Sequence, residues 1–108
     1  MVAADPLDVD PFAALGDPNR RAIVERLADG DRSVQEIADG LTISRPAVSR
    51  HLRLLKEAGL VVDHAEGNRR VYRLDDRGVE VVARYMEEVW GEVAARFRLA
   101  AENTRESG

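Results

Sequence analysis

Apolar residues recur at helical spacing along much of the chain, and the first helical stretches begin at recognisable boundary residues. Asp10-Pro11 and Asp17-Pro18 each place a capping side chain before a proline, which suits the first turn of a helix. The pattern predicts a short helix that stops at Gly16 and a second helix over residues 18–29. Both stretches present an apolar face that needs a partner.

Two further helices follow with only a few residues between them. Ser33 and Glu36 have the spacing of a capping box, in which each side chain bonds the main-chain N–H of the other residue. This box predicts a third, short helix that ends at Gly40. Ser44 can then cap a fourth helix over residues 45–58. The order of helix, tight turn and helix predicts a helix-turn-helix unit.

The pattern changes to β-rich runs after the fourth helix. Residues 60–65 and 69–74 flank a turn in which Gly67 and Asn68 can adopt positive φ, and this predicts a two-stranded wing over residues 60–74. Asp75 then caps a long final helix through Ala100, whose apolar residues recur three and four positions apart. The predicted fold is mainly α with a small β-hairpin: a winged helix-turn-helix with a long C-terminal dimerisation helix.

A length of 108 residues fits one domain. We expect a folded domain over residues 10–100, a flexible N-terminus over 1–9 and a flexible tail over 101–108. No apolar run approaches the roughly 18 residues that span a bilayer, and the N-terminus does not resemble a secretory signal. The expected location is therefore the cytoplasm, without membrane contact. The chain has no cysteine, which excludes disulfides and thiolate metal sites.

Charge is distributed unevenly along the chain, whose formal net charge is −4. Residues 44–73 hold seven basic and three acidic residues, a net charge of +4, and the remainder holds nine basic and 17 acidic residues, a net charge of −8. A polyanion could contact the basic part while the rest repels it.

The fourth helix concentrates that positive charge on one face. A helical wheel places Val48, Leu52 and Leu55 on an apolar arc and the basic side chains opposite. Such a helix suits the DNA major groove, where arginine can reach guanine O6 and N7. Pro46 stiffens its first turn. Arginines of the wing could contact phosphate or enter the minor groove. The alternative interpretation, for the helix and for the wing alike, is that these basic side chains are ordinary surface charges in contact with water.

The strings ALGDPNRRAIVERLADG, SVQEIADGLTISRPAVSRHLRLLKEAGLV and EGNRRVYRLD resemble the ArsR family of bacterial winged helix-turn-helix repressors over roughly residues 11–100. The resemblance implies a homodimer, joined through the first and last helices, that binds an inverted-repeat operator and blocks transcription. Helix 44–58 would lie in the major groove and wing 60–74 at the flanking groove. From the wheel and the resemblance together, we expect these residues at the DNA: Ser44, Arg45, Pro46, Ser49, Arg50, Arg53, Lys56, Arg69, Arg70 and Arg73.

The dimer interface is expected on the first and last helices. Trp90 and Phe97 could instead line a ligand pocket, although aromatic residues at helical spacing suit a helix seam. The residues expected in the interface are Phe12, Leu15, Val82, Met86, Val89, Trp90, Val93 and Phe97.

The family's metal sensors carry ligands that this chain lacks, because it has no cysteine and residues 75–108 contain no histidine. It is more similar to the metal-independent branch, so we expect no metal and no cofactor. His51 is expected to be packed or hydrogen-bonded, and His64 lies on a wing strand.

We find no catalytic arrangement and expect no enzyme. The alternatives to a DNA-binding repressor are a winged-helix module that binds an acidic protein and a repressor gated by an unidentified small ligand.

Overall fold

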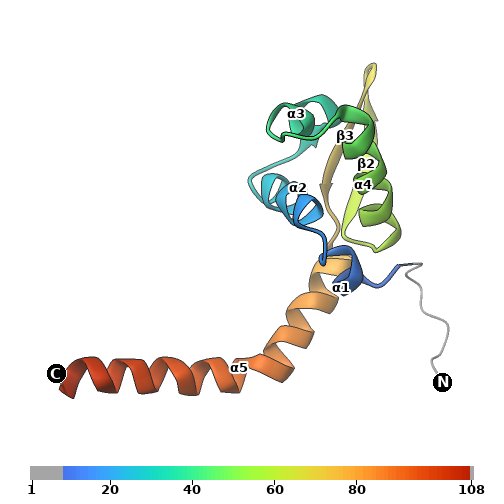
Figure 1. Cartoon of the computed structure of the whole chain (residues 1–108). Coiled ribbons are helices and arrows are strands. Elements are labelled where there is room, and N and C mark those ends of the chain that lie inside the picture. The colour runs from blue at the N-terminus through green and yellow to red at the C-terminus, as the bar shows by residue number, and fades with distance from the viewer. Residues whose placement is uncertain (1–8, 108) are drawn as a thin grey trace, which may run out of the picture.

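The computed structural model describes residues 9–107, with side chains described through residue 102. A head built from four short helices and a small sheet sits at one end of a long helix (Figure 1). In chain order the elements are α1 (Pro11–Ala14), α2 (Pro18–Ala28), β1 (Arg32–Ser33), α3 (Val34–Asp39), α4 (Arg45–Glu57), β2 (Val61–Glu66), β3 (Arg69–Leu74) and α5 (Asp76–Ser107).

The predicted caps begin the first four helices. The Asp10 and Asp17 carboxylates accept hydrogen bonds from main-chain N–H groups of the first turns of α1 and α2. Both bonds of the capping box are present: the Ser33 N–H donates to Glu36 Oε1 at 2.7 Å, and the Glu36 N–H donates to Ser33 Oγ at 3.2 Å. Ser44 Oγ accepts from the main chain of α4. A capping side chain satisfies N–H groups that the first turn of a helix leaves unpaired, so a cap marks where the helix begins. The predicted boundaries of these four helices agree with the observed ones to within two residues.

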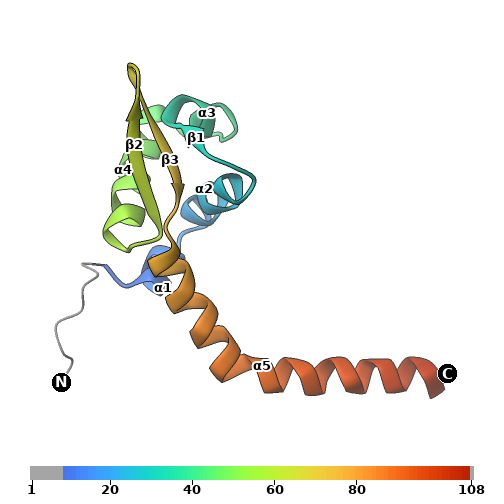
Figure 2. The ribbon, with the colours of Figure 1, turned by 180° about the vertical axis from the view of Figure 1, so that it is seen from behind.

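The sheet holds the predicted wing hairpin and one strand more. β2 and β3 pair antiparallel, and Gly67 at the turn has a φ of 63°. Asn68 does not have a positive φ, so glycine alone uses the left-handed conformation, as in a type II′ turn. The unpredicted strand β1 pairs with β3 and gives the order β1-β3-β2 (Figure 2). Its two residues are too few to show an alternating pattern, and their pairing joins the middle of β3 to the start of α3.

The core lies between the helices of the head and the wing. Val48, Leu52 and Leu55 of α4 are fully buried, as the helical wheel predicts, and they pack in one cluster with Ile23 of α2 and Ile37 of α3. Burying such side chains stabilises the fold by roughly 1.5–3 kcal/mol each. This packing fixes the rotation of α4 about its own axis and so determines which side chains face outward.

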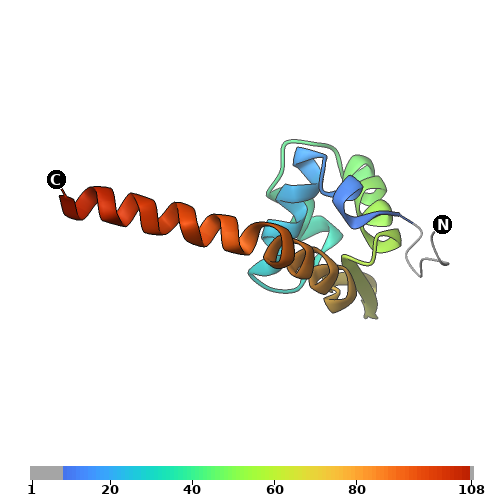
Figure 3. The same cartoon turned by 90° about the horizontal axis from the view of Figure 1, so that it is seen from below.

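Helix α5 leaves the head and extends far beyond it (Figures 1 and 3). The radius of gyration is 17.5 Å, whereas a compact domain of about 100 residues has a value near 13 Å. Near the head, the Phe12 ring of α1 meets the Tyr85 ring of α5 edge-on, with centroids 4.8 Å apart. Most of α5 has no partner within the described part of this chain.

The final helix is longer than predicted. The sequence pattern predicts an end at Ala100, whereas α5 continues to Ser107. The flexibility expected over residues 101–108 stays a prediction. Residues 101–107 contain neither proline nor glycine, and a formed helix propagates easily through such a sequence. The flexible N-terminus expected over 1–9 falls almost wholly on residues 1–8, outside the described residues. In the described range, none of the helices combines the length and the apolar character needed to cross a membrane.

Candidate nucleic-acid interface

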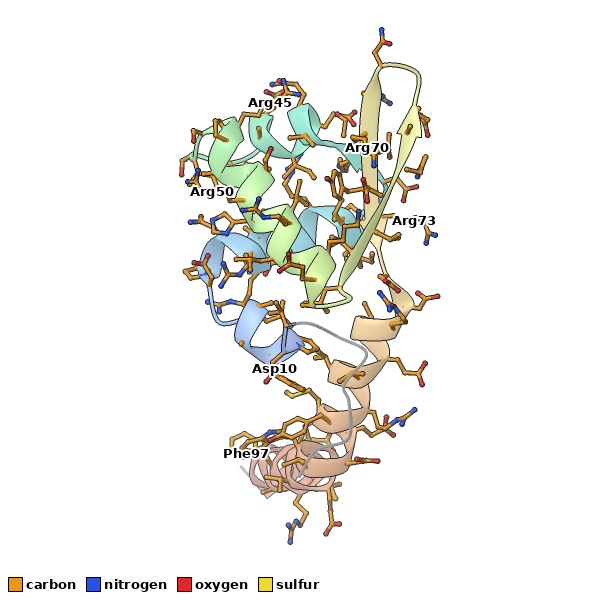
Figure 4. All side chains as sticks on the ribbon, turned by 90° about the vertical axis from the view of Figure 1, so that its right-hand side faces the viewer. Asp10, Arg45, Arg50, Arg70, Arg73 and Phe97 are labelled. Atoms are coloured by element: carbon orange, nitrogen blue, oxygen red, sulfur yellow. The ribbon has the colours of Figure 1, made fainter. Side chains whose placement is uncertain are left out.

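The outward face of α4 carries exposed polar and basic side chains. Ser49, Arg50 and Arg53 are exposed on the side opposite the buried stripe. Among the described residues, Arg50 and Arg53 have no ion pair and no side-chain hydrogen-bond partner, so their guanidinium charges are available to a ligand. Arg45 and Arg50 lie along the same side of the head in Figure 4. A rigid helix with free arginines is suited to reading base edges in a major groove.

Lys56 and Arg70 are bound to a buried carboxylate. The side chain of Asp63 on β2 is only 4% exposed, and its Oδ1 lies 2.8 Å from Lys56 Nζ. Its Oδ2 accepts from Arg70 Nε at 2.9 Å and lies 2.9 Å from a second guanidinium nitrogen. The hydrogen bond from Lys56 holds the pKa of Asp63 below its usual value, so the carboxylate is charged at neutral pH. The cluster ties the end of α4 to both wing strands and offsets part of the charge expected to face DNA.

A cleft of about 330 Å³ separates the wing tip from the starts of α3 and α4. Arg45 and Arg69 line it from α4 and β3. The Arg45 guanidinium donates to the neutral Gln35 amide oxygen at 3.1 Å. Arg69 lies 3.9 Å from the Glu36 carboxylate and 3.8 Å from that of Glu66, which are long separations for ion pairs. These two cations are therefore held loosely and could turn towards a phosphate group.

The remaining residues expected at DNA occupy different surroundings. Ser44 and Pro46 are exposed in the first turn of α4, where Ser44 acts as the cap. Arg73 points away from α4, on the outer side of the wing, while Arg45 and Arg50 lie across the head from it (Figure 4). Arg73 is thus not part of the surface that α4 and the cleft form.

Neither histidine belongs to a metal site in the described part of the chain, where no three candidate ligands cluster. His51 Nδ1 lies 3.3 Å from a guanidinium nitrogen of Arg20. Because a guanidinium group only donates, Nδ1 is the acceptor, and His51 is the hydrogen-bonded histidine that the wheel indicates. His64 pairs with Glu66 on the exposed wing, 3.0 Å apart.

The apolar stripe on α5 is exposed. Met86, Val89, Trp90 and Val93 are each about half exposed, and Phe97 is 76% exposed. Monomeric proteins rarely leave so many large apolar side chains on one continuous surface. The α5 face is therefore suited to burial against another chain.

Two residues expected in the dimer interface also contact the head. Leu15 and Val82 are half-buried against the core cluster. Trp90 and Phe97 line neither the wing cleft nor a second cleft of about 450 Å³ on α5, which is walled by Glu80, Ala83, Arg84, Glu87 and Glu88.

The structure adds three groups to the interface that sequence reasoning does not identify. Asp63 holds Lys56 and Arg70, Gln35 holds Arg45, and Arg20 holds His51. None of the three has a signal in the sequence, because each contact joins residues from different elements.

Comparison with known proteins agrees with this geometry. Residues 17–62 match the family model described as bacterial regulatory protein, arsR family. The chain is 52% identical over 79 residues to the HTH-type transcriptional regulator Rv2034 of Mycobacterium tuberculosis, an alignment that covers 73% of this chain and 74% of that protein. It is 41% identical over 64 residues to the transcriptional repressor SdpR of Bacillus subtilis, covering 59% and 71% of the two chains.

A solved structure also matches. The homodimeric winged helix-turn-helix DNA-binding domain Mb0332 of Mycobacterium bovis, a possible ArsR-family regulator, superposes with a TM-score of 0.61 at 35% identity. The match covers 82% of this chain and 78% of that one.

Proposed function

Because this chain belongs to the ArsR family and is a winged helix-turn-helix transcriptional regulator rather than an enzyme, we propose that it represses transcription as a homodimer bound to an inverted-repeat operator. The free guanidinium groups of Arg50 and Arg53 on α4 are the observation that carries this proposal. Each copy of α4 occupies one half-site, and the half-site centres lie about 34–36 Å apart, one turn of the double helix. A regulator of this kind must have access to chromosomal DNA, and this requirement fits the cytoplasmic location, which stays a prediction.

Dimerisation supplies the two-fold symmetry that an inverted repeat requires. The exposed stripe on α5 is the surface that a second copy buries, together with Phe12 of α1. The M. bovis relative is a homodimer by its own description, and this supports the same assembly here.

Selection of bound fragments from the host genome tests the proposal. Enrichment of one palindromic sequence is expected, and enrichment of none would favour a protein-binding role for the basic face. Arg50→Ala and Arg53→Ala should each lose roughly 1–3 kcal/mol of discrimination between the selected operator and random duplex. Equal losses on operator and random DNA would show that these arginines do not read bases.

A further inference from the structure

The end of α4 and the start of α5 meet at one point, although 18 residues of wing and connecting chain separate them in the sequence. The Gly78 N–H of α5 donates to the Gly59 carbonyl oxygen at 2.7 Å. Beside it, the Asp75 N–H donates to the Leu60 carbonyl oxygen at 2.8 Å. Main-chain atoms make both bonds, so no side-chain rotation can lengthen them.

The contact leaves no room for a side chain on Gly78. A Cβ atom on Gly78 would lie 2.4 Å from the Gly59 oxygen and 2.7 Å from its carbonyl carbon, closer than real Cβ atoms approach. Gly59 itself has a φ of 71°, a conformation that favours glycine. We call this contact the Gly59–Gly78 joint. Both partners are buried, and glycine suits each for a different reason: a Cβ on Gly78 would overlap the Gly59 carbonyl group, and Gly59 has a positive φ.

The joint connects the two helices on which the proposed function depends. Helix α4 carries the arginines that face DNA, and α5 carries the stripe that a second copy covers. In a two-fold dimer, the angle between α4 and α5 determines how far each α4 lies from the symmetry axis. The 13 residues of α4 span about 20 Å, so a rotation of roughly 10° at the joint moves the far end of α4 by about 3.5 Å. That displacement is close to the ~3.4 Å rise of one base pair.

We infer that the Gly59–Gly78 joint determines the spacing between the two half-sites that the protein accepts, and that Gly78 is a positioning residue for DNA recognition. The inference rests on the proposed function, since it requires a dimer that binds two half-sites. It assigns a role to residues that are buried within the chain and do not lie on its exposed faces.

The test compares Gly78→Ala with Gly91→Ala. Both substitutions replace a glycine of α5 by alanine, which has the higher helix propensity. A Cβ on Gly91 would meet only Glu87 Cγ at 3.7 Å, an ordinary contact, so this variant is the matched control. Circular dichroism and sedimentation first establish that each variant is folded and dimeric.

The readout is binding to a set of duplexes in which the two selected half-sites are moved apart or together in steps of one base pair. For Gly78→Ala we expect a preferred spacing that is shifted by at least one base pair or lost, with at least tenfold weaker binding to the natural spacing. Binding to a duplex with a single half-site should change less than twofold. Gly91→Ala should keep the wild-type preference. A folded, dimeric Gly78→Ala protein with the wild-type spacing preference would overturn the inference.

Amide hydrogen exchange on the unaltered protein keeps the inference testable if Gly78→Ala does not fold. The Gly78 and Asp75 amides should exchange as slowly as the amide of Leu52 in the buried part of α4. Rapid exchange at both positions would show that the joint opens and cannot hold an angle. Failure of the proposed function can be distinguished from failure of this inference, because in the first case the wild-type protein would select no palindromic sequence from the genome.

Discussion

Replacing the buried carboxylate of Asp63 tests how α4 and the wing are held together. Asp63→Asn keeps the size of the side chain and removes its negative charge. In the structure Asp63 Oδ1 lies 2.8 Å from Lys56 Nζ, and Oδ2 accepts from Arg70 Nε at 2.9 Å and lies 2.9 Å from a second guanidinium nitrogen. The asparagine oxygen can still accept one of these bonds. The NH₂ group takes the place of the second carboxylate oxygen, and it cannot accept a hydrogen bond from Lys56 or Arg70.

The expected loss follows from the exposure of the partners. Hydrogen bonds to charged groups contribute about 1.5–3 kcal/mol when well buried, and exposed ion pairs contribute about 0–1 kcal/mol. Asp63 is buried, but Lys56 and Arg70 are each about half exposed, so water screens their charges. We therefore expect Asp63→Asn to lower the free energy of unfolding by about 1–2 kcal/mol. At ~4 °C per kcal/mol for a domain of this size, the melting temperature should fall by roughly 4–8 °C.

An exposed pair of similar geometry supplies the control. Glu80 and Arg84 on α5 are 2.7 Å apart, and both side chains are largely exposed. Glu80→Gln should cost at most about 0.5 kcal/mol. Thermal and urea unfolding of both variants at neutral pH measure the difference. If Asp63→Asn is as stable as Glu80→Gln, burial does not strengthen the Asp63 cluster and the reasoning is refuted.

The pH dependence gives a second, independent readout. The pKa of Asp63 is lowered in the folded protein, chiefly by the hydrogen bond from Lys56. A carboxylate with a lowered folded-state pKa stabilises the fold above its unfolded pKa, near 3.9, and that stabilisation is lost as the pH falls through the folded value. The stability advantage of wild type over Asp63→Asn should thus be constant near neutrality and shrink below about pH 4. An advantage that persists undiminished well below the folded pKa would contradict the assignment.

The remaining predictions concern the cap, the cleft and the dimer. Ser33→Ala removes half of the capping box with Glu36 and should lower the free energy of unfolding by about 1 kcal/mol, measured by urea titration; an unchanged midpoint would contradict the role of the cap. If Arg45 and Arg69 hold a single DNA phosphate in the wing cleft, the double alanine variant should reduce the slope of log K against log salt by about 0.9, whereas two separate phosphates predict about 1.8. Trp90→Asp should abolish dimer formation and operator binding together, by sedimentation and gel shift, and a dimeric variant would exclude this residue from the interface.

The parts of the fold that can be predicted are those encoded by neighbours in the sequence. The caps at Asp10, Asp17, Ser33 and Ser44 are local, because each side chain bonds a main-chain group two or three residues away. The apolar face of α4 is local as well, since helical geometry repeats every 3.6 residues. The outward direction of Arg50 follows from that periodicity, and so the centre of the candidate interface can be located from the sequence alone.

Contacts between distant elements cannot be predicted in the same way. Lys56 and Arg70 look like free basic residues in the sequence, because nothing in it shows that the wing brings Asp63 between them. The register that pairs Asp63 with Tyr72 depends on the turn and on packing against α4, and a shift of one residue would turn the carboxylate to the opposite face. The sequence therefore predicts the positive charge of the segment, while the division of that charge between bound and free cations depends on the fold.

The close contact at Gly78 is another feature that joins distant elements and cannot be predicted from the sequence. In a helical pattern a glycine counts only as a cost of about 1 kcal/mol relative to alanine, and nothing in the sequence distinguishes Gly78 from Gly91. The structure separates them, since a Cβ would overlap the main chain of Gly59 at one position and meet a flexible side chain at the other. At Gly78 and beside it, two close main-chain bonds join the start of α5 to the residues that follow α4. If Gly78→Ala shifts the preferred half-site spacing, a residue contributes to recognition by having no side chain, and such a contribution can be located only when both backbones are placed.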